Sequence, residues 1–293
     1  MPELPEVETV KRGLEPALVG RVFARVELRR KDLRFPFPAD FRTRLEGAQV
    51  VGLRRRAKYI LADTDRGDLL LLHLGMTGRF TILKADGRVA TPGEFYDGTA
   101  AAGTADGSHD HVVFHLDDGT RIVYSDHRRF GMMDLQRPGE AHALLKDIGV
   151  EPLGNELSGD YLRGAFASKK APLKAALLDQ RIIAGLGNIY VCEALFRARL
   201  SPKRKAGTIS KKNNPRTDDL VRHVRDILSE AIAAGGSTLQ DYQSTDGTKG
   251  SYQQRFLVYD REGEACHTRG CKSRVRRIVQ SGRSTFYCPT CQR

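Results

Sequence analysis

Four of the chain's five cysteines lie in its C-terminal tail with the spacing C-x4-C-x16-C-x2-C: Cys266, Cys271, Cys288 and Cys291. Two close pairs can each bring two thiolates to one tetrahedral ion, and the long spacer leaves room for a hairpin between them. We expect an intracellular chain with reduced thiols, which favours a metal over a disulfide pair or unrelated surface thiols. The spacing therefore predicts one structural Zn²⁺ ion.

The same tail is strongly basic and contains no acidic residue from position 266 to position 293. Its cations are Arg269, Lys272, Arg274, Arg276, Arg277, Arg283 and Arg293. A hairpin that carries charge of only one sign is expected to lie against phosphates. A charged face that is simply solvated is the alternative.

The N-terminus, "MPELPEVETV", offers a second reactive group. If Met1 is removed, which the small Pro2 allows, the exposed amine is a secondary one. An α-amine has a pKa of about 7.7–8.0, against about 10.4 for lysine, so it is far more often unprotonated near neutral pH. It can condense with an aldehyde carbon to a charged iminium, an electron sink suited to eliminating a neighbouring phosphate. Glu3 could move protons at the sugar; a start without chemical meaning is the alternative.

An N-terminal helix is expected to hold this reactive end in place. Pro5 suits the first helical position, and an apolar stripe recurs at helical spacing until Gly20 stops it. The stripe consists of Val7, Val10, Leu14 and Leu18. A helix packed by this stripe would keep residues 1–4 from fraying.

From Arg21 to about Asp134 the apolar period changes to two, which is typical of strands. In the first such stretch Val22, Ala24, Val26 and Leu28 alternate with Phe23, Arg25 and Glu27. Two later stretches are predicted to be hairpins that turn at positions 66–67 and 118–119, each with a glycine second. This half should be a β-sandwich.

The second half has helical periodicity. Ser158 can cap a helix that runs to about Phe166, Pro172 can start another, and a third begins near Asn188. An amphipathic helix opens at 217–219 and ends at Gly235-Gly236. In the cysteine tail, "RVRRIV" and "STFY" are predicted strands with "QSGR" as their turn.

The composition limits the partners and the compartment. Forty-eight Lys and Arg against 36 Asp and Glu in 293 residues give a net charge of +12, which favours a polyanionic partner. No apolar run approaches the roughly 18 residues of a membrane span, and the first residues lack a secretory h-region. We therefore expect a soluble cytoplasmic protein without a membrane partner.

Several motifs in a particular order carry a resemblance over nearly the whole chain. They are "PELPEVET", "RRAKY", "HLGMTG", "HDHV", "DHRRFG", "GLGNIY", "GGSTLQDY", "DGTKG" and "GRSTFYCPTCQ". With the four-cysteine tail, the chain resembles the formamidopyrimidine-DNA glycosylases, bacterial enzymes of oxidised-purine repair. The resemblance implies a DNA-repair enzyme that acts as a bifunctional glycosylase and abasic-site lyase. It would excise 8-oxoguanine and formamidopyrimidines from duplex DNA and then cleave the strand by β/δ-elimination.

The resemblance also implies a catalytic set at the N-terminus. Pro2 would be the nucleophile that forms a Schiff base with C1′ of the damaged nucleoside. Glu3 would be the acid–base residue and Glu6 would support the site. Lys58 would meet the phosphate beside the lesion; one more surface lysine is the alternative.

Further residues of the family's motifs are expected to contact DNA. Met76, Arg128 and Phe130 would fill the hole left by the extruded base, because a base inside a duplex cannot be reached without flipping. The other expected DNA contacts are His109, Lys174, Asn188 and Arg283. The amide of Asn188 suits a phosphate, and the 235–253 loop would fold over the oxidised purine.

The fold that we expect is α+β. A catalytic β-sandwich domain with a flanking helix would span 1–134, and a linker would span 135–157. A helical helix–two-turn–helix DNA-binding domain with the lesion-capping loop would span 158–262, and a zinc-ribbon β-hairpin would span 263–293. The protein should act as a monomer on duplex DNA, associated with the bacterial nucleoid.

Two positions depart from the family's pattern. The family usually has C-x2-C in the first knuckle, whereas "CHTRGC" inserts two residues, and His267 could compete as a ligand. His127 stands where the family often has proline. Two alternatives remain open: an endonuclease VIII-like glycosylase for oxidised pyrimidines, and a zinc-ribbon DNA-binding protein without catalysis.

Overall fold

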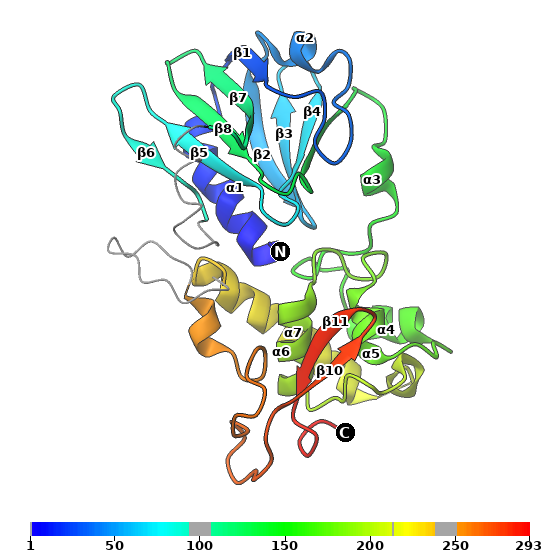
Figure 1. Ribbon diagram of the computed structural model, residues 1–293. Helices are drawn as coiled ribbons and strands as arrows, with labels where there is room; N and C mark the ends of the chain where they lie inside the picture. Colours follow the sequence, from blue (N-terminus) through cyan, green and yellow to red (C-terminus); the bar gives the residue numbers. More distant parts are fainter. Residues whose placement is uncertain (1, 94–106, 213, 238–250) are drawn as a thin grey trace. The chain divides into compact units, whose positions relative to one another are not determined.

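The computed structural model describes residues 2–93, 107–212, 214–237 and 251–293 (Figure 1). The chain divides into two compact units. The N-terminal unit comprises 1–146 with 234–251, and the C-terminal unit comprises 147–233 with 252–293. The domain limits expected from the sequence, at 134, 158 and 263, remain predictions.

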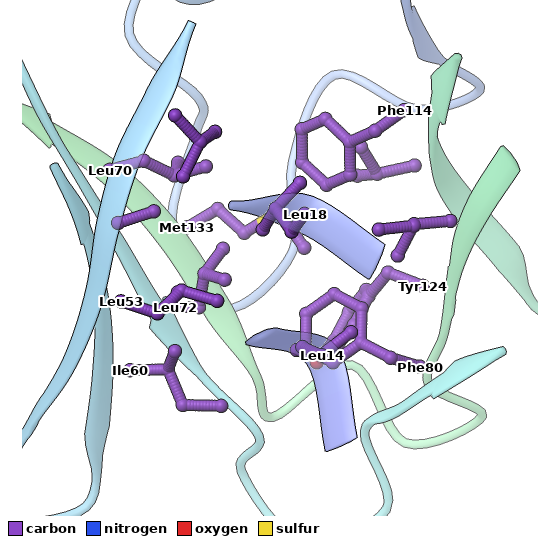
Figure 2. Packing of buried hydrophobic residues seen from close by; sticks show 14 of the residues in the cluster. Leu14, Leu18, Leu53, Ile60, Leu70, Leu72, Phe80, Phe114, Tyr124 and Met133 are labelled. Carbon is purple, nitrogen blue, oxygen red and sulfur yellow. The ribbon is translucent and has the colours of Figure 1, made fainter. Parts of the chain in front are cut away.

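The described part of the N-terminal unit is built on two antiparallel sheets. One has the order β1 (Phe23–Leu28), β7 (Asp110–Leu116), β8 (Arg121–Ser125), β5 (Arg79–Leu83) and β6 (Val89–Ala90). The other has the order β2 (Val50–Arg56), β3 (Tyr59–Thr64), β4 (Leu69–His73) and β9 (Met132–Gln136). The two sheets face each other across one apolar core, so the predicted sandwich is confirmed (Figure 2).

Helix α1 (Leu4–Leu18) packs into this core. The four residues of the predicted stripe are all buried, and Figure 2 shows Leu14 and Leu18 directed between the sheets. The helix ends at the C-cap Val19, and Gly20 follows with a positive φ of 82°. Burial of this stripe anchors the helix, and its first turn therefore holds the N-terminal residues.

The two predicted hairpins are confirmed, but the predicted alternation of the first strand is interrupted at its start. Strands β3 and β4 join around Gly67, and β7 and β8 join around Gly119, both with a positive φ. In β1, Phe23 is fully buried and Ala24 is exposed, because the pairing with β7 shifts between Phe23 and Arg25. A bulge of this kind moves the following side chains to the opposite face.

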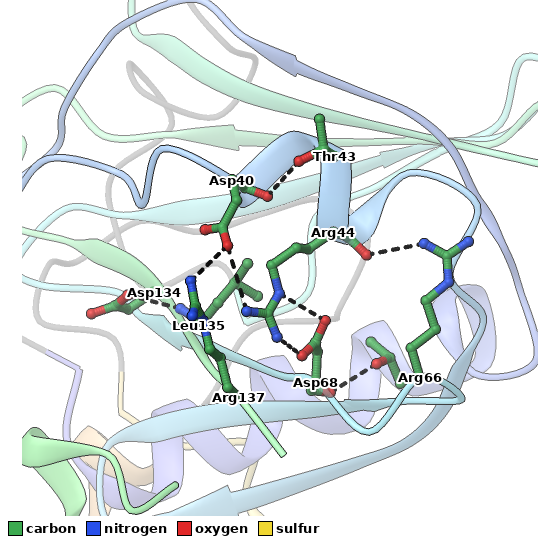
Figure 3. Close-up of polar contacts among 9 residues, drawn as sticks. Asp40, Thr43, Arg44, Arg66, Asp68, Asp134, Leu135 and Arg137 are labelled. Carbon is green, nitrogen blue, oxygen red and sulfur yellow. Dashed lines mark hydrogen bonds and ion pairs between the residues drawn. The ribbon is translucent and has the colours of Figure 1, made fainter. Parts of the chain in front are cut away.

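Charged side chains tie the short helix α2 (Phe41–Leu45) to the sheets (Figure 3). Arg44 on α2 makes an ion pair with the buried Asp68, which lies just before β4. Arg137 reaches the carboxylate of Asp40 at 3.0 Å. After this network the chain forms the short helix α3 (Ala143–Lys146), and the first segment of the N-terminal unit ends at Lys146.

The C-terminal unit is helical and ends in a hairpin. Its elements are α4 (Gly159–Phe166), α5 (Leu173–Leu178), α6 (Asn188–Arg197), η2 (Ala206–Ile209), α7 (Pro215–Ala233), η3 (Tyr252–Arg255), β10 (Arg276–Gln280) and β11 (Arg283–Tyr287). The Ser158 hydroxyl accepts from the N–H of Tyr161, so the predicted cap is confirmed. Helix α7 begins at Pro215, slightly before the predicted start.

The hairpin turns at Ser281-Gly282, where both residues have a positive φ. Two positive φ angles in a two-residue loop match the twist of antiparallel strands. The predicted "QSGR" turn is therefore confirmed. Within the described ranges, no helix has the length and apolar character that crossing a bilayer demands.

Candidate functional site

The four tail cysteines form one cluster. The Sγ atoms of Cys266, Cys271, Cys288 and Cys291 all lie within 4.8 Å of one another. The N–H groups of Thr268 and Cys291 approach the Sγ atoms of Cys266 and Cys288, which lowers the cost of gathering thiolates. The four-sulfur set fits a closed, tetrahedral zinc site with no open position for catalysis. Among the described residues, His267 is not part of the cluster.

The first knuckle brings both of its sulfurs into the cluster despite its two extra residues. Its loop closes through the Cys271 N–H, which donates to the Thr268 carbonyl at 3.0 Å, and Gly270 takes a φ of 79°. A tight turn therefore takes up the extra residues, and both sulfurs still reach the cluster. Cys266 and Cys288 also pack in an apolar cluster with Cys192 and Phe286, which places the metal site against helix α6.

We expect zinc removal to release the β10–β11 hairpin. Zinc binding contributes about 10–16 kcal/mol in zinc-finger peptides, so a chelator or Cys288→Ser should leave the hairpin without most of its stability. Trypsin should then cut rapidly at Arg276, Arg277 and Arg283, as followed by mass spectrometry. Cys192→Ala, which keeps all four ligands, is the control and should cut slowly. A metal-free hairpin that resists trypsin would contradict this prediction.

The N-terminal residues of the predicted catalytic set are buried, and two of them, Glu3 and Glu6, are bonded to each other. Pro2, Glu3 and Glu6 all lie below the surface, with Glu3 and Glu6 each 3% exposed. Glu3 is the N-cap of α1, and its backbone N–H donates to Glu6 Oε2 at 2.9 Å. This is one half of a capping box, which fixes the direction in which the chain enters the helix. The N-terminal residues are therefore held by the start of helix α1.

Glu6 also reaches a residue that the sequence interpretation did not single out. Its Oε1 accepts from both the N–H and the hydroxyl of Ser237, at 2.8 and 3.0 Å. Ser237 lies opposite Ser251 in an isolated antiparallel bridge. Of the predicted lesion-capping loop, 235–253, residues 238–250 lie outside the described residues. Ser237 belongs to the motif "GGSTLQDY", and this motif was the one sequence feature that could have pointed to Ser237.

Lys58 lies in the tight turn between β2 and β3 and is 9% exposed. The preceding Ala57 has a positive φ of 54°. Arg55 anchors this turn, because it donates to the Ala57 carbonyl at 2.9 Å and makes an ion pair with Glu8 of α1 at 3.0 Å. The turn that carries Lys58 is thus tied to the helix that carries the N-terminal residues.

His73, at the end of β4, is a neutral side chain near the cations Lys58 and Arg34. Burial lowers its pKa from 6.5 to about 4, and the positive charges of Lys58 and Arg34 contribute to this lowering of the pKa. Its Nδ1 accepts from the N–H of Gly75 at 3.1 Å, and its ring packs 5.0 Å from that of Tyr59. A histidine held neutral in this way can accept a hydrogen bond without adding charge.

We expect His73 to make folding stability fall as the pH drops from 6.5 to about 4. In that window the unfolded chain binds a proton that the folded chain does not, so stability is complete above the upper value and declines toward the lower one. The loss should approach about 3 kcal/mol below the lower value and should be about 2 kcal/mol at pH 5. Urea unfolding of wild type and His73→Asn at pH 7 and pH 5 measures it. An identical pH dependence in both proteins would contradict the assignment.

Met76, Arg128 and Phe130 lie on two loops of the N-terminal unit, between β4 and β5 and between β8 and β9. Phe130 is 45% exposed, and the guanidinium of Arg128 lies 4.6 Å from the centre of its ring. Half-exposed apolar and planar cationic groups of this kind can stack with bases. His109 is half-buried, with its ring 5.5 Å from that of His127, the residue that replaces the expected proline.

Lys174, Asn188 and Arg283 meet in the C-terminal unit at the zinc hairpin. Lys174 Nζ and Asn188 Nδ2 donate to the same carbonyl, that of Ser284, at 2.9 and 3.0 Å. Lys174 is 1% exposed, so its ammonium lies beneath the hairpin. Arg283, the neighbour of Ser284, is exposed at the turn. Side chains from α5 and α6 thus bind the hairpin backbone directly beside the exposed Arg283.

A buried carboxylate that the sequence interpretation missed joins helix α6 to the segment before the finger. Glu193 accepts from the N–H groups of Leu257, Val258 and Tyr259, at 2.8–3.0 Å. Burial raises its pKa, and these three hydrogen bonds oppose the rise. Glu193 is the single acidic residue within the apolar stretch "NIYVCEALF", and this position could have indicated a buried carboxylate that binds backbone N–H groups.

Three family models match the chain. "Formamidopyrimidine-DNA glycosylase N-terminal domain" matches residues 1–133 and "Formamidopyrimidine-DNA glycosylase H2TH domain" matches 148–243. "Zinc finger found in FPG and IleRS" matches 263–293, in agreement with the four-sulfur cluster. A sandwich, a helical unit and a zinc finger in this order define a DNA glycosylase of the zinc-finger class, an enzyme of DNA repair.

Curated relatives agree over the full length. A protein of Methylobacterium sp. (strain 4-46) named formamidopyrimidine-DNA glycosylase is 59% identical over 297 residues, covering 100% of this chain and 99% of the relative. One of Bradyrhizobium sp. (strain BTAi1 / ATCC BAA-1182) with the same name is 55% identical, with 100% of both chains covered. The chain belongs to the formamidopyrimidine-DNA glycosylase family, which combines glycosylase and abasic-site lyase activities.

Solved structures share the fold. The MutM (Fpg) protein of Thermus thermophilus has a TM-score of 0.79 at 37% identity, covering 99% of this chain and 98% of that one. A Lactococcus lactis enzyme in complex with DNA containing an abasic site has a TM-score of 0.81 at 29% identity, with 100% of both chains covered. The predicted α+β architecture is confirmed by these likenesses.

Proposed function

We propose that this chain removes 8-oxoguanine and formamidopyrimidines from duplex DNA through a Schiff base on Pro2, and then cleaves the resulting abasic site. The observation that carries the proposal is the buried helix start, where Glu6 accepts from the N–H of Glu3, the residue after Pro2. Related Lactococcus lactis proteins have been crystallised with DNA containing Fapy-dG or an abasic site, which supports this substrate class.

The chemistry follows from a secondary amine. After removal of Met1, the lone pair of the Pro2 nitrogen attacks C1′, the bond from C1′ to the base breaks, and the base leaves with that electron pair and takes up the proton that the amine loses. Glu3 then donates a proton to the ring oxygen O4′ as the C1′–O4′ bond breaks, which leaves the opened sugar joined to Pro2 as an iminium. The positive nitrogen withdraws electrons, so a C2′ proton is lost and the bond to the 3′ phosphate breaks. A second elimination breaks the bond to the 5′ phosphate.

The remaining predicted residues divide between the two units. In the N-terminal unit, Lys58 binds a phosphate beside the lesion, while Met76, Arg128 and Phe130 occupy the space of the extruded base. In the C-terminal unit, Asn188 and Arg283 bind phosphates. Lys174 contacts DNA near the damaged base. Its burial and its bonds to the hairpin favour a second role, in which it holds the strand that begins with Arg283.

We also propose the domain limits and surroundings that the sequence suggests. The catalytic domain spans 1–134, the linker 135–157, the helix–two-turn–helix domain 158–262 and the zinc hairpin 263–293. The enzyme works as a monomer in the bacterial cytoplasm, on the DNA of the nucleoid. Its basic surface supports binding to DNA.

Paired oligonucleotides test the substrate class. Duplexes that differ only in carrying 8-oxoguanine or thymine glycol are compared under single-turnover conditions. We expect the oxidised purine to be excised at least about tenfold faster, a discrimination within reach of one binding pocket. Faster excision of thymine glycol would favour the pyrimidine-specific relatives, and no excision of either would favour a DNA-binding protein without catalysis.

A further inference from the structure

One buried carboxylate joins the two loops that carry Met76, Arg128 and Phe130. Asp126, at the end of β8, is fully buried. Its Oδ1 accepts from the hydroxyl of Thr77 at 2.5 Å. Its Oδ2 accepts from the N–H of Gly131 at 2.8 Å and from the hydroxyl of Tyr124 at 3.2 Å. The carboxylate therefore closes its own loop, through Gly131, and holds the neighbouring loop, through Thr77.

Thr77 extends this link to the backbone of Arg128. Its hydroxyl donates to Asp126 and at the same time accepts from the N–H of Arg128 at 3.2 Å. Met76 is the residue immediately before Thr77. The Thr77 hydroxyl thus connects the loop that carries Met76 with the loop that carries Arg128 and Phe130.

The backbones of the two loops are also in direct contact. Gly75 has a φ of 63°, and a Cβ there would collide with the carbonyl of Phe130 and the nitrogen of Gly131. A Cβ on Gly131 would collide with the hydroxyl of Tyr124. Only glycine allows the backbones of two loops to approach so closely. The loops therefore pack as one body around the carboxylate.

We propose that Thr77 and Asp126 are positioning residues that hold Met76, Arg128 and Phe130 together as one preformed wedge. The inference rests on the proposed function, in which these three side chains enter the duplex. A wedge that is ordered before binding avoids the entropic cost of ordering loops on the DNA. The contact of Arg128 with the Phe130 ring belongs to the same preformed arrangement.

If Thr77 and Asp126 act in base extrusion, the effect of replacing Thr77 should depend on the DNA substrate. If they act only in folding, the effect should be the same on every substrate. Excision of a damaged base requires the nucleotide to leave the stack, at a cost of a few kcal/mol, which is least where the nucleotide is already unpaired. A preformed abasic site has no base to unpair. Loss of the wedge geometry should therefore slow base excision much more than cleavage of an abasic site. A loss of folded protein would reduce both activities equally.

The test compares Thr77→Val with Thr77→Ser. Valine keeps the shape of threonine but removes the hydroxyl, whereas serine keeps both hydrogen bonds. Thr77→Val also takes one donor from a buried carboxylate and lowers stability, so rates are measured at a temperature at which circular dichroism shows both variants folded. Each variant receives duplexes with 8-oxoguanine or with a preformed abasic site, under single-turnover conditions.

We expect Thr77→Val to excise 8-oxoguanine about tenfold more slowly than wild type, the scale of two lost hydrogen bonds. Cleavage of the abasic site should change less than about twofold, and Thr77→Ser should match wild type on both duplexes. Equal losses on both duplexes, unchanged excision by Thr77→Val, or equal impairment of Thr77→Ser would overturn the inference. Failure of wild type to excise 8-oxoguanine would instead refute the proposed function.

Discussion

Pro2→Gly should form no covalent adduct with 8-oxoguanine DNA when borohydride is added, whereas wild type should be trapped. Strand cleavage should fall on the order of 10³-fold or more, the scale on which loss of a nucleophile acts. Glycine also permits removal of Met1, so both proteins expose an amine. Glycine, however, lacks the ring that fixes the nitrogen at the helix start, so its amine is not held within bonding reach of C1′.

Pro5→Ala is the matched control for the helix. Pro5 is a second buried proline, in the first turn of α1, and alanine is tolerated there. We expect Pro5→Ala to be trapped as wild type is. The intact mass of each purified protein reports whether Met1 has been removed. Wild-type protein that keeps Met1 and still nicks lesion DNA at full rate would rule out the Pro2 mechanism.

Glu3→Gln should lower the rate of base excision by about 10²–10⁴-fold, the usual contribution of a positioned acid or base. Glutamine keeps the size of the side chain but cannot move a proton. Affinity for the same duplex should stay within about threefold, a change smaller than about 1 kcal/mol. Single-turnover excision and fluorescence anisotropy at one fixed salt concentration measure the two quantities.

Glu15→Gln serves as the control for charge on the same helix. Glu15 pairs with Lys11 on the exposed side of α1 and has no bond to the N-terminal residues in the described contacts. Its replacement should leave excision unchanged. If Glu3→Gln lost binding and excision to the same extent, Glu3 would be a structural N-cap rather than the acid–base residue.

Features set by neighbours along the chain could be predicted from the sequence. The stripe of α1 recurs every three or four residues, so its buried face follows from helical geometry alone. The turns at Gly67 and Gly119 need positive φ angles, which glycine adopts at little cost. The paired cysteines carry their own ligand spacing, and they gather as expected. The motifs that identify the family belong to the same class of local signals.

The start of β1 could not be predicted in this way. Alternation grouped Phe23 with Arg25 and Glu27, but the large ring of Phe23 is buried against Phe114, with the two ring centres 5.2 Å apart. A shift in the pairing with β7 allows this burial. The burial of one aromatic side chain outweighed the regularity of the strand, since apolar area buried is worth more than one ladder bond.

The bonds that organise the site were decided by the tertiary structure. Ser237 reaches Glu6 from more than 200 residues along the chain, Lys174 reaches under the hairpin to Ser284, and Thr77 reaches Asp126 from the loop between β4 and β5. Sequence spacing sets helices, turns and metal knuckles, because these depend on residues a few positions apart. Which distant partner satisfies a buried polar group depends on how the finished core brings the elements together, because leaving that group unpaired would cost more than most single contacts return.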